Sequence, residues 1–368
     1  MSRNRIIYQS ESLVTSLITG QSTGINIIKM TEASLSEEVS RKDVNIFGKL
    51  AAIDRPILEE PQVTLDFNYY LTDGENESKL GFPIDGNTNF LSGMLSNSSG
   101  ANRNFYMITV PEGQDAHSIN PNSSTNAIAG IGNAFVSKYT VDLKVGEIPT
   151  ASLSADCSNV TFGYGTTGGV PNPAISVTGS VPTQIAGNII MPTINVTGDG
   201  EVTVLRPGDI VLDFGNASLD MGGAILIGMT EADTLQSAHV NSVTIDVPMS
   251  RTPLSRIGNH FAFSKELDVP INVTLSATAD MADISTGSLV NLICAGSTER
   301  DISITMYGPC EAGSAPLLKY TLKGATLDSQ SLSSSIGSNK SVDLKFTAQI
   351  GGANDTTKGL FVSGAYAG

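Results

Sequence analysis

The sequence predicts a mainly β protein that consists of two tandem β-sandwich or barrel domains. Glycine, serine, threonine, asparagine and valine recur throughout the 368 residues, and long blocks of alanine, leucine, glutamate and lysine are absent. β-Branched residues fit a pleated sheet, and glycine, asparagine and serine supply turns. The length suits about two domains. A segment that occurs twice is the third observation.

The repeated segment is 40–65, which a shift of 210 positions places on 250–275. The identities are Ser40, Arg41, Gly48, Ala52, Val63, Thr64 and Leu65 with Ser250, Arg251, Gly258, Ala262, Val273, Thr274 and Leu275. Further along, Lys138-Tyr139-Thr140 recurs as Lys319-Tyr320-Thr321. Solenoid units span roughly 20–50 residues, so a longer spacing indicates a duplicated domain. We expect domain 1 at 1–162, a Gly/Pro/Thr-rich linker or small insertion at 163–200, and domain 2 at 201–368.

The first half begins with expected strands over 5–18 and an extended segment over 25–39. A proline-containing excursion over 40–61 follows, since its prolines disfavour helix. Residues 62–71 form the clearest strand, because apolar and polar side chains alternate there with period two. Residues 73–77 read as a turn and 88–95 as one short helix. Strands are expected at 105–110, 134–144 and 151–162.

The second half repeats this order of elements. A strand at 240–247 leads into a second excursion at 248–270, which also contains prolines, and then into an alternating strand at 271–277. A short helix is expected at 288–295. Strands at 302–306, 320–327 and 342–350 complete the half.

The formal net charge of −15 arises from 36 acidic and 21 basic side chains. Such a chain is a poor candidate for gripping nucleic acid, because the phosphates must be neutralised by lysine and arginine. It suits a surface that DNA passes without sticking, although simple solubility explains the charge equally directly.

Cellular location follows from the cysteines and the apolar runs. Cys157, Cys294 and Cys310 are odd in number and have no metal-ligand spacing, which indicates folding in a reducing cytoplasm. The first eleven residues contain two arginines and no apolar core of signal-peptide length, and no run approaches the ~18 apolar residues of a membrane span. We expect a protein made in a cytosol without export and without a membrane-spanning segment.

Two glycine motifs resemble catalytic signatures but lack the required context. Residues 20–24 match G-x-S-x-G, yet a nucleophile elbow needs a helix after it, and the strand-like Ile25-Asn26-Ile27-Ile28 follows. Residues 163–168 match G-x-G-x-x-G, yet Gly169-Val170-Pro171-Asn172-Pro173 prevents the helix that would hold a phosphate. Neither motif predicts an active site.

Other candidate ligands are scattered. His117, His239 and His260 are far apart in the sequence, and residues 73–77 lack the pattern of a calcium loop. Glycosylation sequons at Asn97, Asn122, Asn195 and Asn272 mean little without a secretory signal. We therefore expect no enzyme, with no catalytic, cofactor-binding or metal-binding residues and no cofactor.

The segments 41–55 and 61–71, together with Tyr8-Gln9-Ser10-Glu11-Ser12-Leu13, resemble the major tail tube proteins of tailed bacteriophages. The resemblance covers roughly the first 80 residues, extends to the second half through the repeat, and is absent from 163–200. It implies a β-sandwich closing toward a barrel, flanked by one short helix, with a long loop that reaches a neighbouring subunit.

Several functional expectations come with that resemblance. Single-domain relatives form hexameric rings that stack into a tube, so a chain with two copies implies a homotrimer with pseudo-sixfold symmetry and helical assembly. The implied location is the virion, with assembly in the host cytoplasm. The implied partners are the chain itself, through 40–61 and 248–270, and the tape measure, terminator, baseplate or tip proteins, with a sheath if the tail contracts.

The residues themselves fit such an assembly. Exposed strand edges are a liability unless they are paired, and ring closure pairs them. An acidic channel would let DNA pass transiently and without specificity, and we expect polar residues of the alternating strands, such as Asp66, to face it. The alternative is a β-sandwich fibre or adhesin that binds a host or a carbohydrate. That alternative predicts clustered exposed aromatics, whereas tryptophan is absent and aromatics make up 6%.

Overall fold

The computed structural model describes residues 11–18, 25–95, 101–118, 120, 122–177, 182–191, 203–213, 239–280, 299–310, 315–333 and 340–366. The described chain is mainly β, which confirms the predicted fold class. Antiparallel pairing links sixteen strands into one sheet system. Among the described helices, none is long and apolar enough to cross a membrane.

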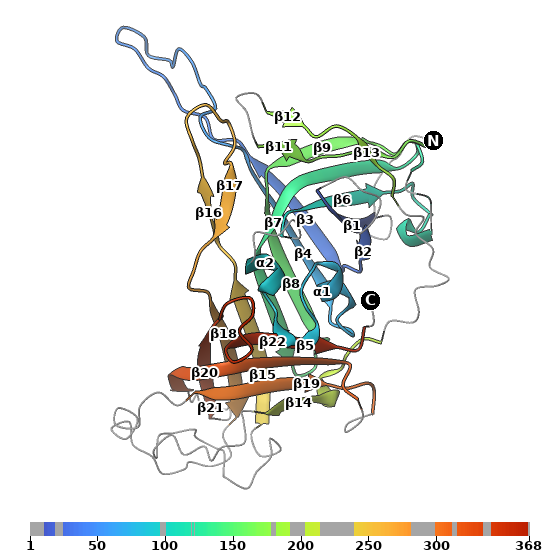
Figure 1. Ribbon diagram of the computed structural model, residues 1–368, viewed down its shortest axis with the longest axis vertical. Coiled ribbons are helices and arrows are strands. Elements are labelled where there is room, and N and C mark those ends of the chain that lie inside the picture. The colour runs from blue at the N-terminus through green and yellow to red at the C-terminus, as the bar shows by residue number, and fades with distance from the viewer. Residues whose placement is uncertain are drawn as a thin grey trace.

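One continuous antiparallel sheet of eight strands, here called the joined sheet, runs through both halves of the chain (Figure 1). Its order is β3 (Glu32–Glu38), β4 (Gln62–Tyr70), β8 (Thr150–Cys157), β7 (Ala127–Lys144), β15 (His239–Pro248), β18 (Asn272–Asp280), β21 (Ser341–Gln349) and β20 (Leu318–Ser333). The first four strands come from the N-terminal half and the last four from the C-terminal half.

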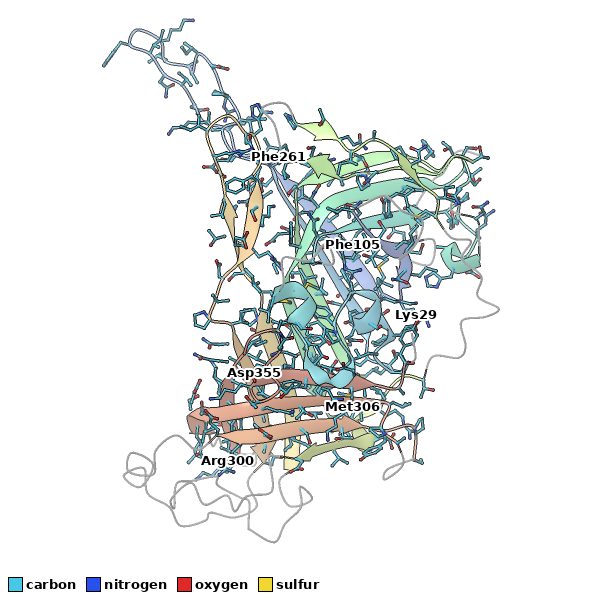
Figure 2. The ribbon with its side chains drawn as sticks, viewed as in Figure 1. Lys29, Phe105, Phe261, Arg300, Met306 and Asp355 are labelled. Atoms are coloured by element: carbon cyan, nitrogen blue, oxygen red, sulfur yellow. The ribbon has the colours of Figure 1, made fainter. Side chains whose placement is uncertain are left out.

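Each half adds an outer sheet through one long strand. The first part of β7 pairs with β6 (Arg103–Thr109) and β9 (Asn159–Tyr164), and β1 (Glu11–Leu17) and β2 (Asn26–Ile28) extend this sheet beyond β6. The first part of β20 pairs with β19 (Arg300–Met306) and β22 (Gly359–Gly364), with β14 (Ile210–Asp213) beyond β19 and β5 (Asp85–Asn89) beyond β22. Figure 2 shows Phe105 in the N-terminal outer sheet and Met306 in the C-terminal one.

The alternating strands place one face in the core and one outside. In β4 the side chains of Val63, Leu65, Phe67 and Tyr69 are buried, whereas Asp66 is exposed. β18 shows the same alternation from Val273 to Ala279. Burial of alternate residues is what a period-two pattern predicts for a sheet with one covered face.

A buried polar cluster lies in the core between the two halves. The Tyr69 and Tyr139 hydroxyls donate to one carboxylate oxygen of Glu77 over 2.9 and 3.0 Å, and the hydroxyls of Tyr139 and Tyr320 are 2.8 Å apart. Glu77 is 1% exposed. Burial raises the pKa of the Glu77 carboxyl, because a charge loses water there. Tyr320 belongs to the C-terminal half, so the cluster joins the halves.

The helices differ from the sequence prediction. Helix α1 (Glu75–Lys79) occupies the segment predicted as a turn, and it ends in an i,i+4 ion pair between Glu75 and Lys79. Within the predicted helix 88–95, only α2 (Ser92–Leu95) is helical, because Thr88 and Asn89 extend β5 toward β22. Two single turns of 3-10 helix occupy Ala116–Ser118 and Pro207–Asp209. The helix expected at 288–295 lies outside the described residues.

The described part of 163–200 forms short strand pairs against the N-terminal outer sheet. Strands β10 (Val170–Pro171) and β13 (Asn188–Ile189) pair, as do β11 (Ile175–Ser176) and β12 (Thr183–Gln184). Val170, Ile189 and Met191 pack into a second core cluster with residues of β1 and β6.

Two hairpins occupy the proline-containing excursions. The first, over 40–61, is held by the isolated bridges Arg41↔Ile57 and Val44↔Asp54 and projects from the body at the upper left of Figure 1. The second consists of β16 (Arg251–Leu254) and β17 (Ser264–Leu267). These are called the first and second hairpins below.

Candidate functional site

The motifs flagged in the sequence do not converge in the described structure. Gly163 and Tyr164 end β9, and the strand β10 follows where a phosphate loop would open a helix. No group of three histidine, cysteine or acidic side chains with metal-binding geometry occurs among the described residues. Burial raises the pKa of the Cys157 thiol to about 12, so this cysteine is a poor nucleophile. Residues 20–24 lie outside the described residues.

Strand registers instead reveal a repeated interface. The shift of 210 residues maps Leu35↔Leu65 onto Ile245↔Leu275, and it maps the first hairpin's Val44↔Asp54 onto the second hairpin's Leu254↔Ser264. The hairpin turns correspond as well, since Gly48 and Gly258 both have positive φ, at 86° and 95°. Residues 32–70 and 242–280 therefore match without insertion.

The later strands match at a shift of 191 residues. Arg103↔Ala134 corresponds to Arg300↔Ala325, and the bulge at Ser137 in β7 corresponds to the bulge at Asp328 in β20. Under this register the counterpart of Tyr139 is Gln330. The predicted equivalence of Lys138-Tyr139-Thr140 with Lys319-Tyr320-Thr321 is therefore wrong, being ten positions out of register.

The closed junction is the place where β7 pairs with β15, and it joins the two halves. Its register runs from Pro248↔Lys138 to Ser242↔Lys144. On the outer face, the Lys138 ammonium lies 3.1 Å from the Asp246 carboxylate, to which the Thr140 hydroxyl also donates over 2.9 Å. On the core face, Ile245 and Val141 pair directly and are 1% and 0% exposed.

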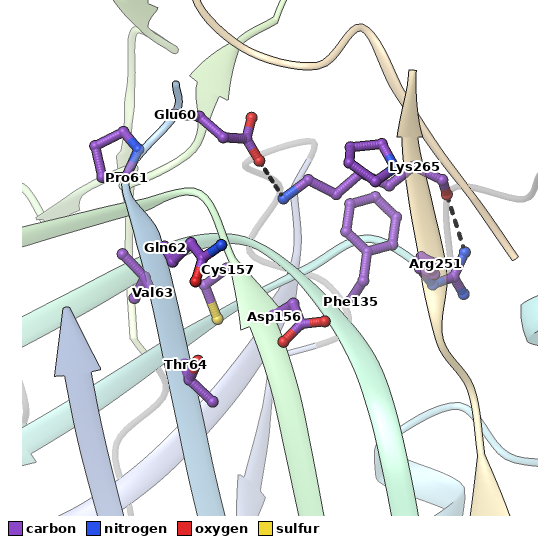
Figure 3. A pocket seen from close by; sticks show the side chains of 11 residues that line it. Glu60, Pro61, Gln62, Val63, Thr64, Phe135, Asp156, Cys157, Arg251 and Lys265 are labelled. Atoms are coloured by element: carbon purple, nitrogen blue, oxygen red, sulfur yellow. Dashed lines mark hydrogen bonds and ion pairs between the residues drawn. The ribbon is translucent and has the colours of Figure 1, made fainter. Parts of the chain in front are cut away.

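The second hairpin packs over the end of the closed junction and encloses an open cavity of about 260 Å³ (Figure 3). The Lys265 ammonium lies 2.9 Å from the Glu60 carboxylate and donates to the Ser158 hydroxyl over 3.0 Å. The backbone N–H of Ala262 donates to the second Glu60 oxygen over 3.0 Å. The hairpin of the C-terminal half is thus attached to the N-terminal half, which the sequence did not predict.

Arg251 lies at the base of this hairpin. Its guanidinium stacks 4.9 Å from the centre of the Phe135 ring and donates through Nη1 to the Lys265 carbonyl over 3.2 Å. Partial burial lowers the pKa of Arg251 and raises that of Asp156, which lines the same cavity. The positive charges of Lys265 and Arg251 act in the opposite direction on the Asp156 pKa. The cavity therefore pairs an arginine of one half with a carboxylate of the other.

Both partners in the closed junction have counterparts at the ends of the joined sheet. β3, the counterpart of β15, pairs with β4 on one side only among the described strands. The second part of β20, the counterpart of the second part of β7, likewise pairs only with β21. We call these the open edges. The sequence offered one signal for them, the alternation of 32–38, but nothing in it identified β20 as the complementary edge.

The outer face of the joined sheet is polar and predominantly acidic. Register with Asp66 places these acidic residues on that face: Glu32, Glu38, Asp66, Asp142, Asp156, Asp246, Asp280 and Asp343. The basic side chains there are Lys138, Lys144 and Lys345. No helix pairs a charge of its own with this face in the described chain, so the face carries an excess of negative charge.

Comparison with known proteins leaves the family open. No family model matches the chain, and no curated protein matches it. Among solved structures, the tail tube of SPP1, determined by solid-state NMR and cryo-EM, aligns with a TM-score of 0.31 and 8% sequence identity. The alignment covers 44% of this chain and 81% of that one. A TM-score this low does not define a shared fold.

Proposed function

We propose that this chain is a structural protein of a phage tail tube, which assembles with copies of itself into rings that stack into a tube. The observation that carries the proposal is the pair of open edges. Each end of the joined sheet presents the counterpart of one partner in the closed junction, so a second chain can add to either end in the same way. Such a head-to-tail interface generates rings when the rotation closes.

Two tandem copies of one domain in each chain are part of this proposal, with three chains forming a ring of six similar units. Three chains would contribute twenty-four strands to one closed sheet. With strands spaced about 4.8 Å apart, such a barrel has a diameter on the order of 40 Å, which leaves a wide channel. Closure would also remove both unpaired edges, which otherwise favour aggregation.

The acidic outer face of the joined sheet, including Asp66, would line this channel. Its excess of carboxylates would repel the phosphates of DNA in transit and so prevent binding to the wall. The chain would act in the virion and not as an enzyme, and its assembly in the host cytoplasm remains part of the proposal.

Stacking would use the hairpins. Phe47 and Leu50 at the first turn and Ile257 at the second are fully exposed. Exposed apolar side chains on projecting hairpins are typical of interaction sites. Their partners would be the next ring or, at the ends of the tube, other tail proteins such as the tape measure, terminator, baseplate or tip, with a sheath if the tail contracts.

Electron microscopy of the purified full-length chain, with mass determination in solution, tests the proposal. We expect rings or tubes with a central pore, and a smallest assembly of three times the 38.4 kDa chain mass. Compact monomers at high protein concentration, with no ring in any condition, would overturn it.

A further inference from the structure

We propose that β20 of one chain pairs with β3 of the next in a single register, with Leu332 opposite Leu35, and that the contacts Gln330–Glu37 and Asp328–Arg41 select this partner. The proposal rests on the ring assembly proposed above and specifies its joint. The occupant of each open edge is therefore a second copy of this chain.

The register is transferred from the closed junction. Val141 in β7 is opposite Ile245 in β15. The shift of 191 leads from Val141 to Leu332, and the shift of 210 leads from Ile245 back to Leu35. Leu332 is 47% exposed and Leu35 is half-buried. Pairing covers both leucines, whereas a slip by one residue would turn Leu332 to the polar face of the neighbouring edge.

Gln330 has an amide that lacks a partner within the described chain. Its Nε2 atom is buried and makes no hydrogen bond. Its counterpart Tyr139 is opposite Val247, and the counterpart of Val247 is Glu37, which is exposed on β3. In the transferred register, the Gln330 amide lies opposite the Glu37 carboxylate and can donate to it. An apolar pair in the closed junction thus becomes a polar pair at the open edges, and it satisfies a buried donor.

The arginine–carboxylate contact is transferred in an exchanged form. In the N-terminal half, Asp156 on β8 is hydrogen-bonded to Ser137 on the bulge of β7, and it shares a cavity with Arg251. In the C-terminal half the corresponding pair is Thr347 and Asp328, and the Thr347 hydroxyl donates to the Asp328 carboxylate. The carboxylate is kept but moves to the adjacent strand.

Arg41 is the counterpart of Arg251 and supplies the missing cation. Its side chain is exposed at the base of the first hairpin. When β3 of one chain docks on β20 of another, the first hairpin takes the place of the second hairpin and brings Arg41 over the bulge at Asp328. The pair combines opposite charges at the edge of a sheet, where they favour one partner and one orientation.

The rest of the outer face at the open edges is uncharged at the corresponding positions. The counterparts of Thr244, Asp246, Lys138, Thr140 and Asp142 are all serines, namely Ser34, Ser36, Ser329, Ser331 and Ser333. Because these serines provide neither attraction nor repulsion between charges, Arg41 and Asp328 carry the charge recognition at the joint.

A charge exchange tests the recognition pair by sedimentation and electron microscopy of the full chain. Arg41→Asp and Asp328→Arg should each weaken ring formation by about tenfold, and the double variant should restore it. Lys42→Asp is the matched control, since it makes the same charge change on the adjacent residue, and its rings should equal those of the wild type. Thermal unfolding of each variant verifies that the chain folds.

Cysteine cross-linking tests the register. In a background with Cys294→Ser and Cys310→Ser, the pair Leu35→Cys and Leu332→Cys should give covalent closed trimers on oxidation. The pair Ser36→Cys and Leu332→Cys, displaced by one residue, should not.

The outcomes separate the two proposals. If the wild type forms no rings, the proposed function is overturned. If it forms rings, but the double charge exchange fails to restore assembly or the displaced cysteines cross-link better, the joint proposed here is wrong and the ring assembly stands.

Discussion

The closed junction and the open edges share one backbone register but differ in side chains. At the closed junction, Lys138 and Asp246 form an ion pair on the outer face, and Val247 faces Tyr139 in the core. At the open edges the corresponding positions are serines outside and Glu37 and Gln330 inside. A partner within the same chain is always present at high effective concentration, so the closed junction needs stability more than selectivity.

An open edge must instead discriminate between partners. A strand edge that is apolar and flat pairs with any other strand, and natural proteins protect such edges with charges. β3 has three glutamates at its open edge, Glu32, Glu37 and Glu38. They repel one another when two β3 strands approach, whereas β20 offers Gln330. The difference between the two regions is therefore one of specificity on a shared geometry.

The largest expected effect breaks the closed junction. Ile245→Asp buries a carboxylate opposite Val141 without a partner and should destabilise the chain by about 3–5 kcal/mol. Leu35→Asp, its counterpart, should leave the unfolding free energy of the isolated chain within about 1 kcal/mol of the wild type and still prevent ring formation. Denaturant unfolding and sedimentation check both. Equal destabilisation by the two substitutions would contradict the comparison.

The hairpins give the second test. Lys265→Ala removes the contacts with Glu60 and Ser158 and should cost about 1–3 kcal/mol, because the ion pair is largely buried. Amide hydrogen exchange in 251–267 should rise with it. Arg55→Ala at the corresponding position of the first hairpin removes an exposed pair with Asp43 and should change the stability of the isolated chain by less than about 1 kcal/mol. A hairpin whose exchange is unchanged in the Lys265 variant would show that these contacts do not hold it.

Glu77 provides a pH-dependent test of the core between the halves. Its folded-state pKa is raised by burial, so its contribution to stability is present below its unfolded pKa of about 4.3 and is lost as the pH rises through the folded value. Glu77→Gln keeps an acceptor for Tyr69 and Tyr139 without the charge. Unfolding free energies measured from pH 4 to 8 should therefore favour the glutamine variant increasingly as the pH rises. A constant difference across that range would exclude the titration of Glu77 as the cause.

The smallest expected effect sharpens the comparison by transplanting the ion pair. Ser36→Asp with Ser329→Lys copies Asp246 and Lys138 to the open edges and should tighten ring assembly by up to about fivefold at low salt, since an exposed pair contributes less than about 1 kcal/mol. Ser36→Lys with Ser329→Asp reverses the pair and serves as the control. Sedimentation at two salt concentrations measures the gain, which should shrink at high salt. An equal gain without salt dependence would point to a different cause.

The sequence by itself determined the strands and the repeat. Alternation over 62–71 and 271–277 produced β4 and β18, because a period of two places every second side chain in the core whatever the partner strand is. The identities between 40–65 and 250–275 marked hairpins with matching turns, because a glycine with positive φ leaves a signal in local sequence. The expectation of no compact catalytic motif also came from local context alone.

Only the tertiary structure decided which strands meet. Helix α1 formed where a turn was predicted, because Glu77 is held in the core by tyrosines far away in the sequence. The correct counterpart of Tyr139 required the strand register, since a tripeptide identity cannot reveal a slip of ten residues. The closed junction and the open edges are pairings between distant strands. Their partners depend on the geometry of the whole sheet, which no local pattern encodes.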